Sequence, residues 1–281
     1  MPRRILRVFV ALLFLAGLAV LLYPTISNAW NEYLHARLIR DYQQDVANYS
    51  EEERKRLFLE ALDYNAHHTY NTVYDVFDDE EYELTHPYDT LLNPAGDGIM
   101  GYIEIPRIKQ RLIIYHGTSA AVLEQGIGHI QGTSLPVGGE SSHAVLAGHR
   151  GLPTAKLFTD LDQLAAGDVF YLNVIGRVLA YEVDQIKVVE PDALEDLDII
   201  AGQDLVTLLT CTPYGVNTQR LLVRGHRVPY DGQMAEERQE AASNPALPLW
   251  VAGIVLTALL LIVIRIIVSK KPRREEGNQN E

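Results

Sequence analysis

The alternation of apolar and polar residues divides the chain into an apolar start, a polar region with helical spacing, a long region of short strands and an apolar end. Residues 8–23 carry no charge and follow three arginines, which predicts a membrane-targeting element. The sequence Ser-Asn-Ala at 27–29 fits a cleavage site, so a removed signal peptide and a retained anchor both stay open. In either case we expect the following residues to be exported.

The region 30–76 is polar, with apolar residues at helical spacing that predict a first helix. Ser50 and Glu53 match a capping box, which predicts that a second helix begins just after Ser50. His67 and His68 lie near the end of that helix, where the helix dipole favours positive charge, and we prefer this interpretation to a paired metal site. Both helices are expected to act as scaffold.

From Ile99 onward the pattern changes to short apolar or alternating runs, separated by Gly, Pro, Asn and Asp. At least seven of these runs are predicted strands, including the two that flank Cys211. Short helices are expected near 120–125 and 154–164. Short strands at regular spacing are typical of a closed or nearly closed β-barrel, so the fold class is mainly β.

Residues 246–268 are apolar except for Arg265, which is long enough to span a bilayer. Arg265 lies near the end of this run, where it can snorkel, and four basic residues follow within 270–274, which places this end in the cytoplasm. Because arginines also precede the first apolar run, both ends are predicted inside and the middle of the chain outside.

The formal net charge of −13 limits the kinds of partner that the protein can bind. A nucleic-acid-binding surface needs clustered Lys and Arg, which the middle of the chain lacks, so we expect no nucleic-acid partner. Cys211 is the only cysteine, so no disulfide can form within the chain and the fold depends on its apolar core. A lone thiol is either buried filler or a reactive group.

Cys211 lies at a position that suits a nucleophile. Apolar runs at 205–209 and 221–223 flank a segment rich in turn residues, which predicts strand, loop and strand. A thiol at the end of the first strand is held by the sheet and faces the loop side, where a substrate can reach it. Arg220 opens the returning strand and would lie beside the thiol across the hairpin.

These residues resemble a sortase. Residues 207–211, Thr-Leu-Leu-Thr-Cys, match the family's Thr-Leu-x-Thr-Cys motif, and the following Thr-Pro-Tyr-Gly-x-Asn-Thr-x-Arg-Leu-Leu-Val-Arg-Gly-His is similar to its class C, pilin-polymerising branch in Gram-positive bacteria. The resemblance implies that Cys211 is the nucleophile, Arg220 the active-site arginine, and His149, in Ala-Gly-His-Arg-Gly, the third member. It covers roughly 98–227 and implies an eight-stranded sortase barrel.

Other residues compete for these roles. His143 lies on the approach to the strand before His149 and is its strongest rival, while His226 follows the second strand of the hairpin. Arg224 and Arg227 are alternatives to Arg220, but both lie farther along the strand. The family context favours His149 and Arg220. We see no cluster of His, Asp and Glu that requires a metal.

The chemistry of the three residues is acyl transfer. A cysteine attacks as thiolate, which is scarce at neutral pH because the pKa of a free thiol is about 8.5. His149 can stabilise the thiolate as imidazolium and then protonate the leaving amine, while Arg220 binds the substrate carbonyl or the developing oxyanion. A thioester conserves acyl-transfer potential, so no cofactor is expected.

The resemblance implies a reaction and partners. Cys211 would cleave an LPxTG-type sorting signal between Thr and Gly, form a thioacyl enzyme and pass the acyl group to a lysine amine of the next pilin subunit. Attachment of surface proteins to the cell wall is the close alternative. A membrane-tethered cysteine peptidase, with water as acceptor, and a non-enzymatic surface protein also stay open.

In class C sortases a segment before the catalytic domain forms a lid, with an Asp-Pro-aromatic tripeptide over the active site. The nearest match here is His86-Pro87-Tyr88, in which histidine replaces aspartate. An aspartate can pair with Arg220, whereas a histidine cannot do so usefully in either protonation state, so a lid would rest on Tyr88. Without the resemblance, this acidic, turn-rich stretch is a solvated linker.

The expected organisation has six parts. They are a membrane anchor or signal segment (1–29), a helical region with the lid (30–97), the catalytic β-barrel (98–230), a polar linker (231–245), a transmembrane helix (246–269) and a cytoplasmic tail (270–281). The catalytic domain would then be extracellular, at the cell membrane.

Overall fold

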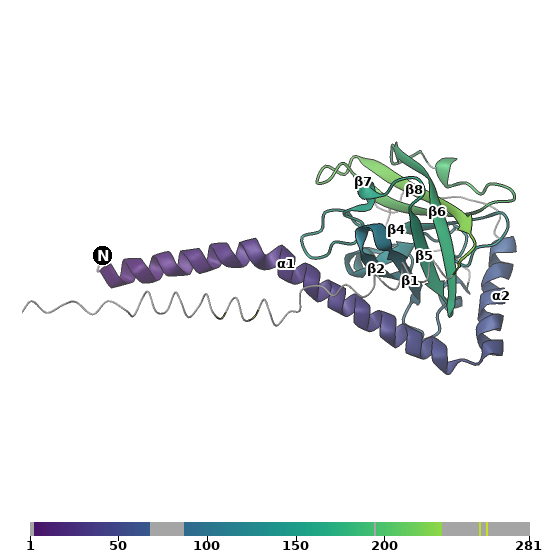
Figure 1. Ribbon diagram of the computed structural model, residues 1–281, viewed down its shortest axis with the longest axis horizontal. Helices are drawn as coiled ribbons and strands as arrows, with labels where there is room; N and C mark the ends of the chain where they lie inside the picture. The colour runs from purple at the N-terminus through teal and green to yellow at the C-terminus, as the bar shows by residue number, and fades with distance from the viewer. Residues whose placement is uncertain (1–2, 68–86, 194, 232–252, 254–256, 258–281) are drawn as a thin grey trace, which may run out of the picture. The chain divides into compact units, whose positions relative to one another are not determined.

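The computed structural model describes residues 3–67, 87–193, 195–231, 253 and 257 (Figure 1). It contains two compact units, Met1–Trp30 with Pro245–Glu281, and Asn31–Asn244. The second unit holds every strand found among the described residues. The elements are α1 (Arg3–Asn48), α2 (Glu51–His67), η1 (Pro87–Thr90), β1 (Ile99–Ile105), η2 (Pro106–Ile108), β2 (Gln110–His116), α3 (Ala120–Gln125), β3 (Ile127–His129), β4 (Ser142–Ala147), η3 (Leu161–Gln163), β5 (Val169–Val174), β6 (Arg177–Val189), η4 (Glu195–Leu197), β7 (Asp204–Thr212) and β8 (Gln219–Val228).

The strands close into one barrel in the order β1-β2-β3-β4-β7-β8-β6-β5. Most neighbours are antiparallel, but β2 pairs with β3 and β4 pairs with β7 in parallel. Closure removes the free sheet edges that an open sheet would expose. The predicted mainly β fold, an eight-stranded barrel preceded by helices, is confirmed.

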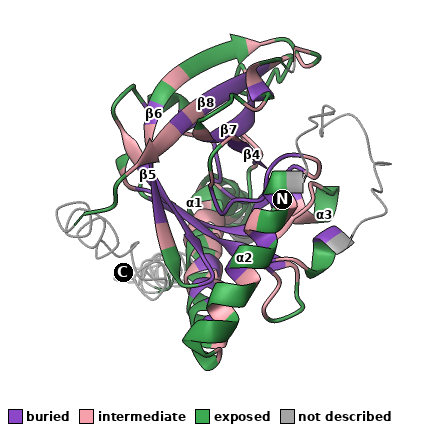
Figure 2. Ribbon diagram, turned by 90° about the vertical axis from the view of Figure 1, so that its right-hand side faces the viewer, coloured by how far each residue is buried: buried purple, intermediate pink, exposed green. Residues whose placement is uncertain are grey.

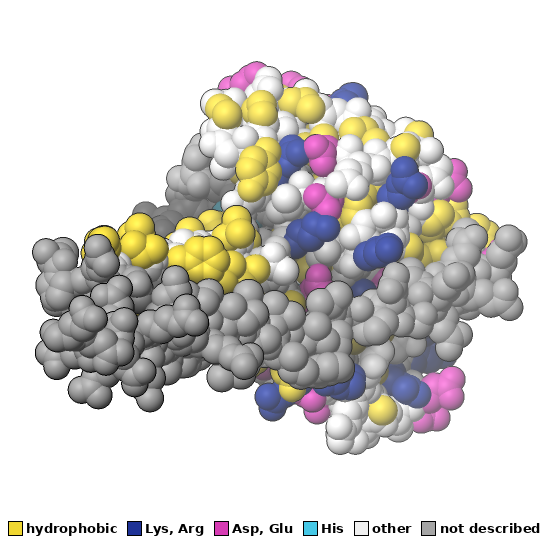
Figure 3. Space-filling model, turned by 60° about the vertical axis from the view of Figure 1, so that its left-hand side comes forward, with side chains coloured by type: hydrophobic (Ala, Val, Ile, Leu, Met, Phe, Trp, Pro, Cys, Tyr) yellow, Lys and Arg dark blue, Asp and Glu magenta, His cyan; other side chains and the backbone are white. Residues whose placement is uncertain are grey.

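Helix α1 differs from the expectation in its extent. The sequence predicted an apolar run ended by proline and then a separate helix, whereas one helix runs from Arg3 to Asn48 with Pro24 inside it. It is the one helix, among the described residues, that is long and apolar enough to cross a membrane. Figure 3 shows apolar side chains gathered along the N-terminal part of this helix.

The second half of α1 packs on the barrel through a small apolar cluster. Ile39, Tyr42 and Val46 of the helix meet Ile99 and other residues of β1 and β2. The Tyr42 hydroxyl donates to the carbonyl of Met100 at 3.0 Å and accepts from the amide of Ile175 at 2.8 Å. These bonds join the helix to the start of β1 and to the residue that follows β5. The helical spacing seen in the sequence thus marks a buried contact face.

Helix α2 begins as the capping box predicts. The Ser50 amide donates to Glu53 Oε2 at 2.8 Å, and the Glu53 amide donates to Ser50 Oγ at 3.2 Å. Phe58 and Ala61 on its inner face belong to the main core. Near its end, Asn65 donates to the carbonyl of Leu135 and accepts from the amide of that residue, so the helix is fixed to a barrel loop.

The short helices agree with the prediction in part. Helix α3 lies at 120–125 as expected, but 154–164 contains only the 3-10 turn η3. The backbone there makes other bonds: the amide of Phe158 donates to the carbonyl of His149, and the amide of Thr159 donates to that of Lys156. The segment is therefore a loop folded back on the end of β4.

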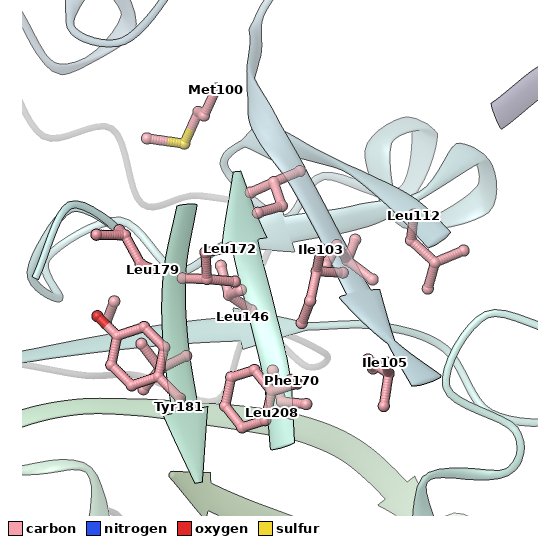
Figure 4. Close-up of a cluster of buried hydrophobic side chains, with 14 of the residues drawn as sticks. Met100, Ile103, Ile105, Leu112, Leu146, Phe170, Leu172, Leu179, Tyr181 and Leu208 are labelled. Carbon is pink, nitrogen blue, oxygen red and sulfur yellow. The ribbon is translucent and has the colours of Figure 1, made fainter. Parts of the chain in front are cut away.

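The barrel interior is filled by side chains from all sides. Figure 4 shows Ile103, Phe170, Leu172 and Leu208 turned toward a common centre. The rings of Phe170 and Tyr181 stack with centroids 5.7 Å apart. In Figure 2 the strands β4, β5 and β7 carry buried residues along most of their length, whereas the second half of β6 is largely exposed.

Strands β4, β7 and β8 are buried on both faces. Leu146, Leu208 and Val223 belong to the barrel interior, while Val145, Leu209 and Leu222 belong to a second cluster on the opposite face. Successive side chains of a strand point to opposite faces, so this double burial explains why these strands read as continuous apolar runs. The second cluster, which we call the outer floor, comprises Leu123, Ile130, Val145, Ala147, Leu197, Leu209 and Leu222.

Tyr88 anchors the start of the barrel domain. It is 1 % exposed, and its hydroxyl accepts from the Gly117 amide at 3.0 Å and lies 2.8 Å from His129 Nδ1. His129 Nε2 lies 2.8 Å from the carbonyl of Ser134, which can only accept, so Nε2 carries the proton and Nδ1 accepts from Tyr88. Burial lowers the pKa of His129 to about 4, which keeps the ring neutral at physiological pH.

Replacing Tyr88 by phenylalanine is expected to lower the free energy of unfolding by about 1–3 kcal/mol, because the half-buried amide of Gly117 and the buried Nδ1 of His129 lose this hydroxyl as a partner. Urea unfolding of the full chain in detergent measures this change. Tyr214→Phe is the control, because the Tyr214 side chain is exposed. Equal stability of the two variants would contradict the anchoring role.

Candidate active site

Three residues named in the sequence come to one end of the β4, β7 and β8 strands. Cys211 is the last residue but one of β7 and pairs directly with Arg220 of β8. The parallel ladder between β4 and β7 ends at the pair of Ala147 and Leu209. His149 follows that ladder end by two residues, as Cys211 does on the neighbouring strand. The fold therefore brings the thiol, the guanidinium and the imidazole to one mouth.

The site faces the outer floor rather than the barrel interior. Cys211 shares its face of β7 with Leu209, and Arg220 shares its face of β8 with Leu222. Leu197 of η4 and Leu123 of α3 also pack on this floor. The thiol therefore shares its face of the sheet with a packed and buried apolar cluster.

Both strand residues are largely buried. Cys211 is 7 % exposed and Arg220 is 5 % exposed. The guanidinium Nη1 of Arg220 lies 3.3 Å from each of the carbonyl oxygens of Asn217 and Gln219, to which it donates. Asn217 lies in the loop between β7 and β8 and Gln219 is the first residue of β8, so the hairpin itself fixes the arginine beside the thiol.

His149 is half-buried, and its surroundings act on its charge. Burial lowers the pKa of His149, while the nearby carboxylate of Glu124 on α3 acts in the opposite direction. The neutral imidazole is therefore the favoured form at neutral pH. When an imidazolium and thiolate pair forms, the carboxylate of Glu124 stabilises the imidazolium and the positive charge of Arg220 stabilises the thiolate.

Backbone bonds hold the loop that carries His149. The Gly148 amide donates to the carbonyl of Leu209 at 3.0 Å, and Thr210 Oγ1 donates to the carbonyl of Gly148 at 2.6 Å. A Cβ on Gly148 would lie 2.7 Å from the ring of Phe158, so a side chain there would displace the loop. Glycine at this position permits the close approach.

The rival histidines and arginines have other surroundings. His143 is buried, with Nδ1 2.9 Å from the carbonyl of Asp198 and Nε2 2.7 Å from Thr207 Oγ1. His226 pairs with Leu205, toward the start of β7 and away from Cys211. Arg224 binds Asp184 through two nitrogens, and Arg227 lies 3.9 Å from a carboxylate oxygen of Asp204.

The lid tripeptide is described only in part. His86 lies outside the described residues, and Tyr88 is the buried anchor whose hydroxyl meets His129 and Gly117. His129 pairs with Leu146, which in turn pairs with Leu208, three residues before Cys211 on β7. The Tyr88 ring therefore contacts the barrel well below the thiol. A lid formed by His86, Pro87 and Tyr88 stays a prediction.

One residue at this mouth was missed by sequence reasoning. Arg150 Nη1 donates to Thr212 Oγ1 at 2.9 Å, and its Nη2 binds the carboxylate of Asp162. The only signal in the sequence is its place directly after His149.

In the described ranges no three His, Cys, Asp or Glu side chains are grouped so that they could hold a metal ion.

Comparisons with known proteins agree with this arrangement. A model of the sortase domain matches residues 103–228. Sortase D of Bacillus subtilis is 31 % identical over 138 residues, which are 48 % of this chain and 67 % of that protein.

Solved structures extend the similarity. The structure of Streptococcus pneumoniae sortase C has a TM-score of 0.66 and 43 % identity, over 70 % of this chain and 98 % of that one. Sortase C-1 of Actinomyces oris has a TM-score of 0.60 and 45 % identity, over 63 % of this chain and 99 % of that one. The chain belongs to the sortase family of cysteine transpeptidases, and class C sortases are among its structural neighbours.

Proposed function

We propose that this sortase joins pilin subunits covalently. The observation that carries the proposal is the pairing of Cys211 with Arg220 across β7 and β8, with His149 at the same strand end. Two further facts support it. Class C sortases are its structural neighbours, and the Streptococcus pneumoniae sortase C among them has pilin substrates.

In the first half of the reaction, Cys211 Sγ attacks the Thr carbonyl of an LPxTG-type sorting signal as thiolate. Arg220 stabilises the negative oxygen that forms on that carbon, and His149 gives its proton to the amine of the departing Gly. The C–N bond breaks and a thioester with Cys211 remains.

In the second half, the neutral amine of a pilin lysine attacks the thioester carbonyl. The neutral His149 accepts a proton from this amine, the C–S bond breaks and the thiolate returns. The product is an isopeptide bond between two subunits. The thioester supplies the acyl-transfer potential, so the reaction proceeds without a cofactor.

The proposal includes the arrangement of the chain at the membrane. Helix α1 supplies a membrane anchor, and residues 98–230 act outside the cell as the catalytic barrel. The linker 231–245, the second span 246–269 and the tail 270–281 complete the proposed organisation. These last three parts fall outside the described residues apart from Asp231, Gly253 and Thr257.

Hydrolysis and aminolysis distinguish this function from that of a peptidase. The full chain in detergent is given an LPxTG-type peptide and a lysine-containing acceptor peptide, and products are identified by mass spectrometry. We expect the branched, amide-linked product to exceed the free acid. An acceptor with norleucine in place of lysine should give none, because it lacks the amine. Free acid as the main product with either acceptor would favour the peptidase.

A further inference from the structure

The ends of β4 and β7 are joined by contacts on both sides of His149 and Cys211. On one side Thr210 Oγ1 donates to the carbonyl of Gly148. On the other side Arg150 Nη1 donates to Thr212 Oγ1. The first bond joins Gly148 and Thr210, which directly precede His149 and Cys211. The second bond joins Arg150 and Thr212, which directly follow them. The regular ladder has already ended at Ala147 and Leu209, so these side-chain bonds replace it.

The Arg150 side chain is buried in the protein and does not extend into solvent. Its side chain is 8 % exposed, and the Nε atom is buried without a hydrogen-bond partner. The carboxylate that it binds, on Asp162, is half exposed and belongs to η3. A long cationic side chain is buried at a cost in hydration and rotamer entropy, and only part of its hydrogen-bonding capacity is used here. Its burial is therefore poorly explained by stability alone.

We propose that Arg150 is a positioning residue for the transpeptidation reaction, because it fixes the separation of His149 and Cys211 through Thr212. The fork of its guanidinium holds two groups at once: the hydroxyl next to the thiol, and the loop that folds back on His149. Asp162 sets the direction of the fork, and the Phe158 amide, which donates to the His149 carbonyl, closes the same loop.

The separation matters because proton transfer and ion pairing decline steeply with distance. A displacement of about 1 Å at a reacting centre can lower the rate about 100-fold. The ionisable groups around the pair are Arg220 across the hairpin, Glu124 on α3, and Arg150 with Asp162. Arg220 and Glu124 do not depend on the bond to Thr212. Loss of that bond therefore tests the relative position of His149 and Cys211, while the charges of Arg220 and Glu124 stay in place.

The test compares Arg150→Met, Thr212→Val and the double variant with wild type, in the full chain. Thr212→Ser retains the hydroxyl and should behave like wild type. Arg224→Met is the matched control, because Arg224 is another arginine of this sheet that binds an aspartate, Asp184, which it holds through two nitrogens. It touches no residue adjacent to Cys211 or His149 in the described structure.

Two quantities are measured. In transpeptidation of an LPxTG-type peptide, Arg150→Met and Thr212→Val are each expected to lower kcat about 10- to 100-fold with KM within about twofold. The double variant should be no slower than the slower single variant, because both changes break one bond. Losses that multiply, or a loss of similar size in Arg224→Met, would overturn the proposal.

The second quantity needs no substrate. The rate of alkylation of Cys211 by iodoacetamide is followed against pH and gives the apparent pKa of the thiol. Arg150→Met and Thr212→Val should each raise this pKa, because the thiolate loses the ring N–H of His149 as a stabilising partner. Thr212→Ser and Arg224→Met should leave it in place. An unchanged thiol pKa in Arg150→Met would overturn the proposal.

The turnover measurement rests on the proposed function, whereas the alkylation measurement does not. A wild-type enzyme that is inert toward the peptide, but whose thiol pKa rises in both variants, would refute the substrate class and support the positioning role. A wild-type enzyme that turns over the peptide, with no effect of either variant, would support the function and refute the positioning role.

Discussion

Cells in which Cys211 is replaced by alanine are expected to lose the high-mass ladder of surface protein, leaving pilin monomers. Alanine has no nucleophile, so the thioester cannot form, and no other cysteine exists in the chain to replace it. We expect the rate of polymerisation to fall by about 10⁴-fold or more, as for other enzymes that lose their nucleophile. The measurement is the size distribution of surface proteins extracted from the native host.

The host experiment avoids dependence on how a purified fragment behaves. Expression of the wild-type chain from a plasmid should restore the ladder, and circular dichroism of the purified variant should match that of wild type. A ladder that survives unchanged would exclude Cys211 as the source of polymerisation in that host. Monomers released into the medium would point instead to attachment of surface proteins to the wall.

His149→Gln is expected to lower kcat/KM by about 10²- to 10⁴-fold, because glutamine cannot give a proton to the leaving amine. The wild-type enzyme should show a bell-shaped dependence of kcat/KM on pH, since the active form needs both thiolate and imidazolium. Burial lowers the pKa of His149, so the acid limb of the bell should lie below the ordinary histidine range. In His149→Gln any residual rate should follow the thiolate alone, so it should rise with pH and show no basic limb.

Glu124→Gln provides the matched test of that assignment. The carboxylate of Glu124 raises the pKa of His149 against the effect of burial, so its neutralisation should lower that pKa further. The acid limb should then move to lower pH, while the basic limb stays in place. A fixed acid limb would mean that another group titrates there.

The adjacency of Cys211 and Arg220 could be predicted from the sequence because both residues lie next to strong local patterns. Cys211 and Arg220 lie on either side of a run of turn residues between two apolar runs. That pattern predicts a hairpin in which the two residues face each other, and the structure pairs them directly. His149 depended on the family motif. Its place beside Cys211 comes from the parallel pairing of β4 with β7, which no local pattern reveals.

The features that the sequence did not reveal depend on contacts between distant segments. Tyr88 is a core anchor because His129, 41 residues away, supplies a ring nitrogen. Arg150 meets Thr212 across 62 residues, and helix α1 continues through Pro24, where a local rule predicts a break. Periodicity describes the environment of a segment but not the partner that it meets.

The parallel pairing of β4 with β7 also governs when the thiol becomes reactive. Gly148 and Thr210, which close the strand end, are 62 residues apart, and β5 and β6 lie between them in the chain. Contacts of such long sequence separation form late and slowly in folding, after the entropy of loop closure has been overcome. A chain whose barrel is unfinished therefore has a thiol without its partners. The arrangement of thiol, imidazole and guanidinium is therefore complete only in the finished barrel.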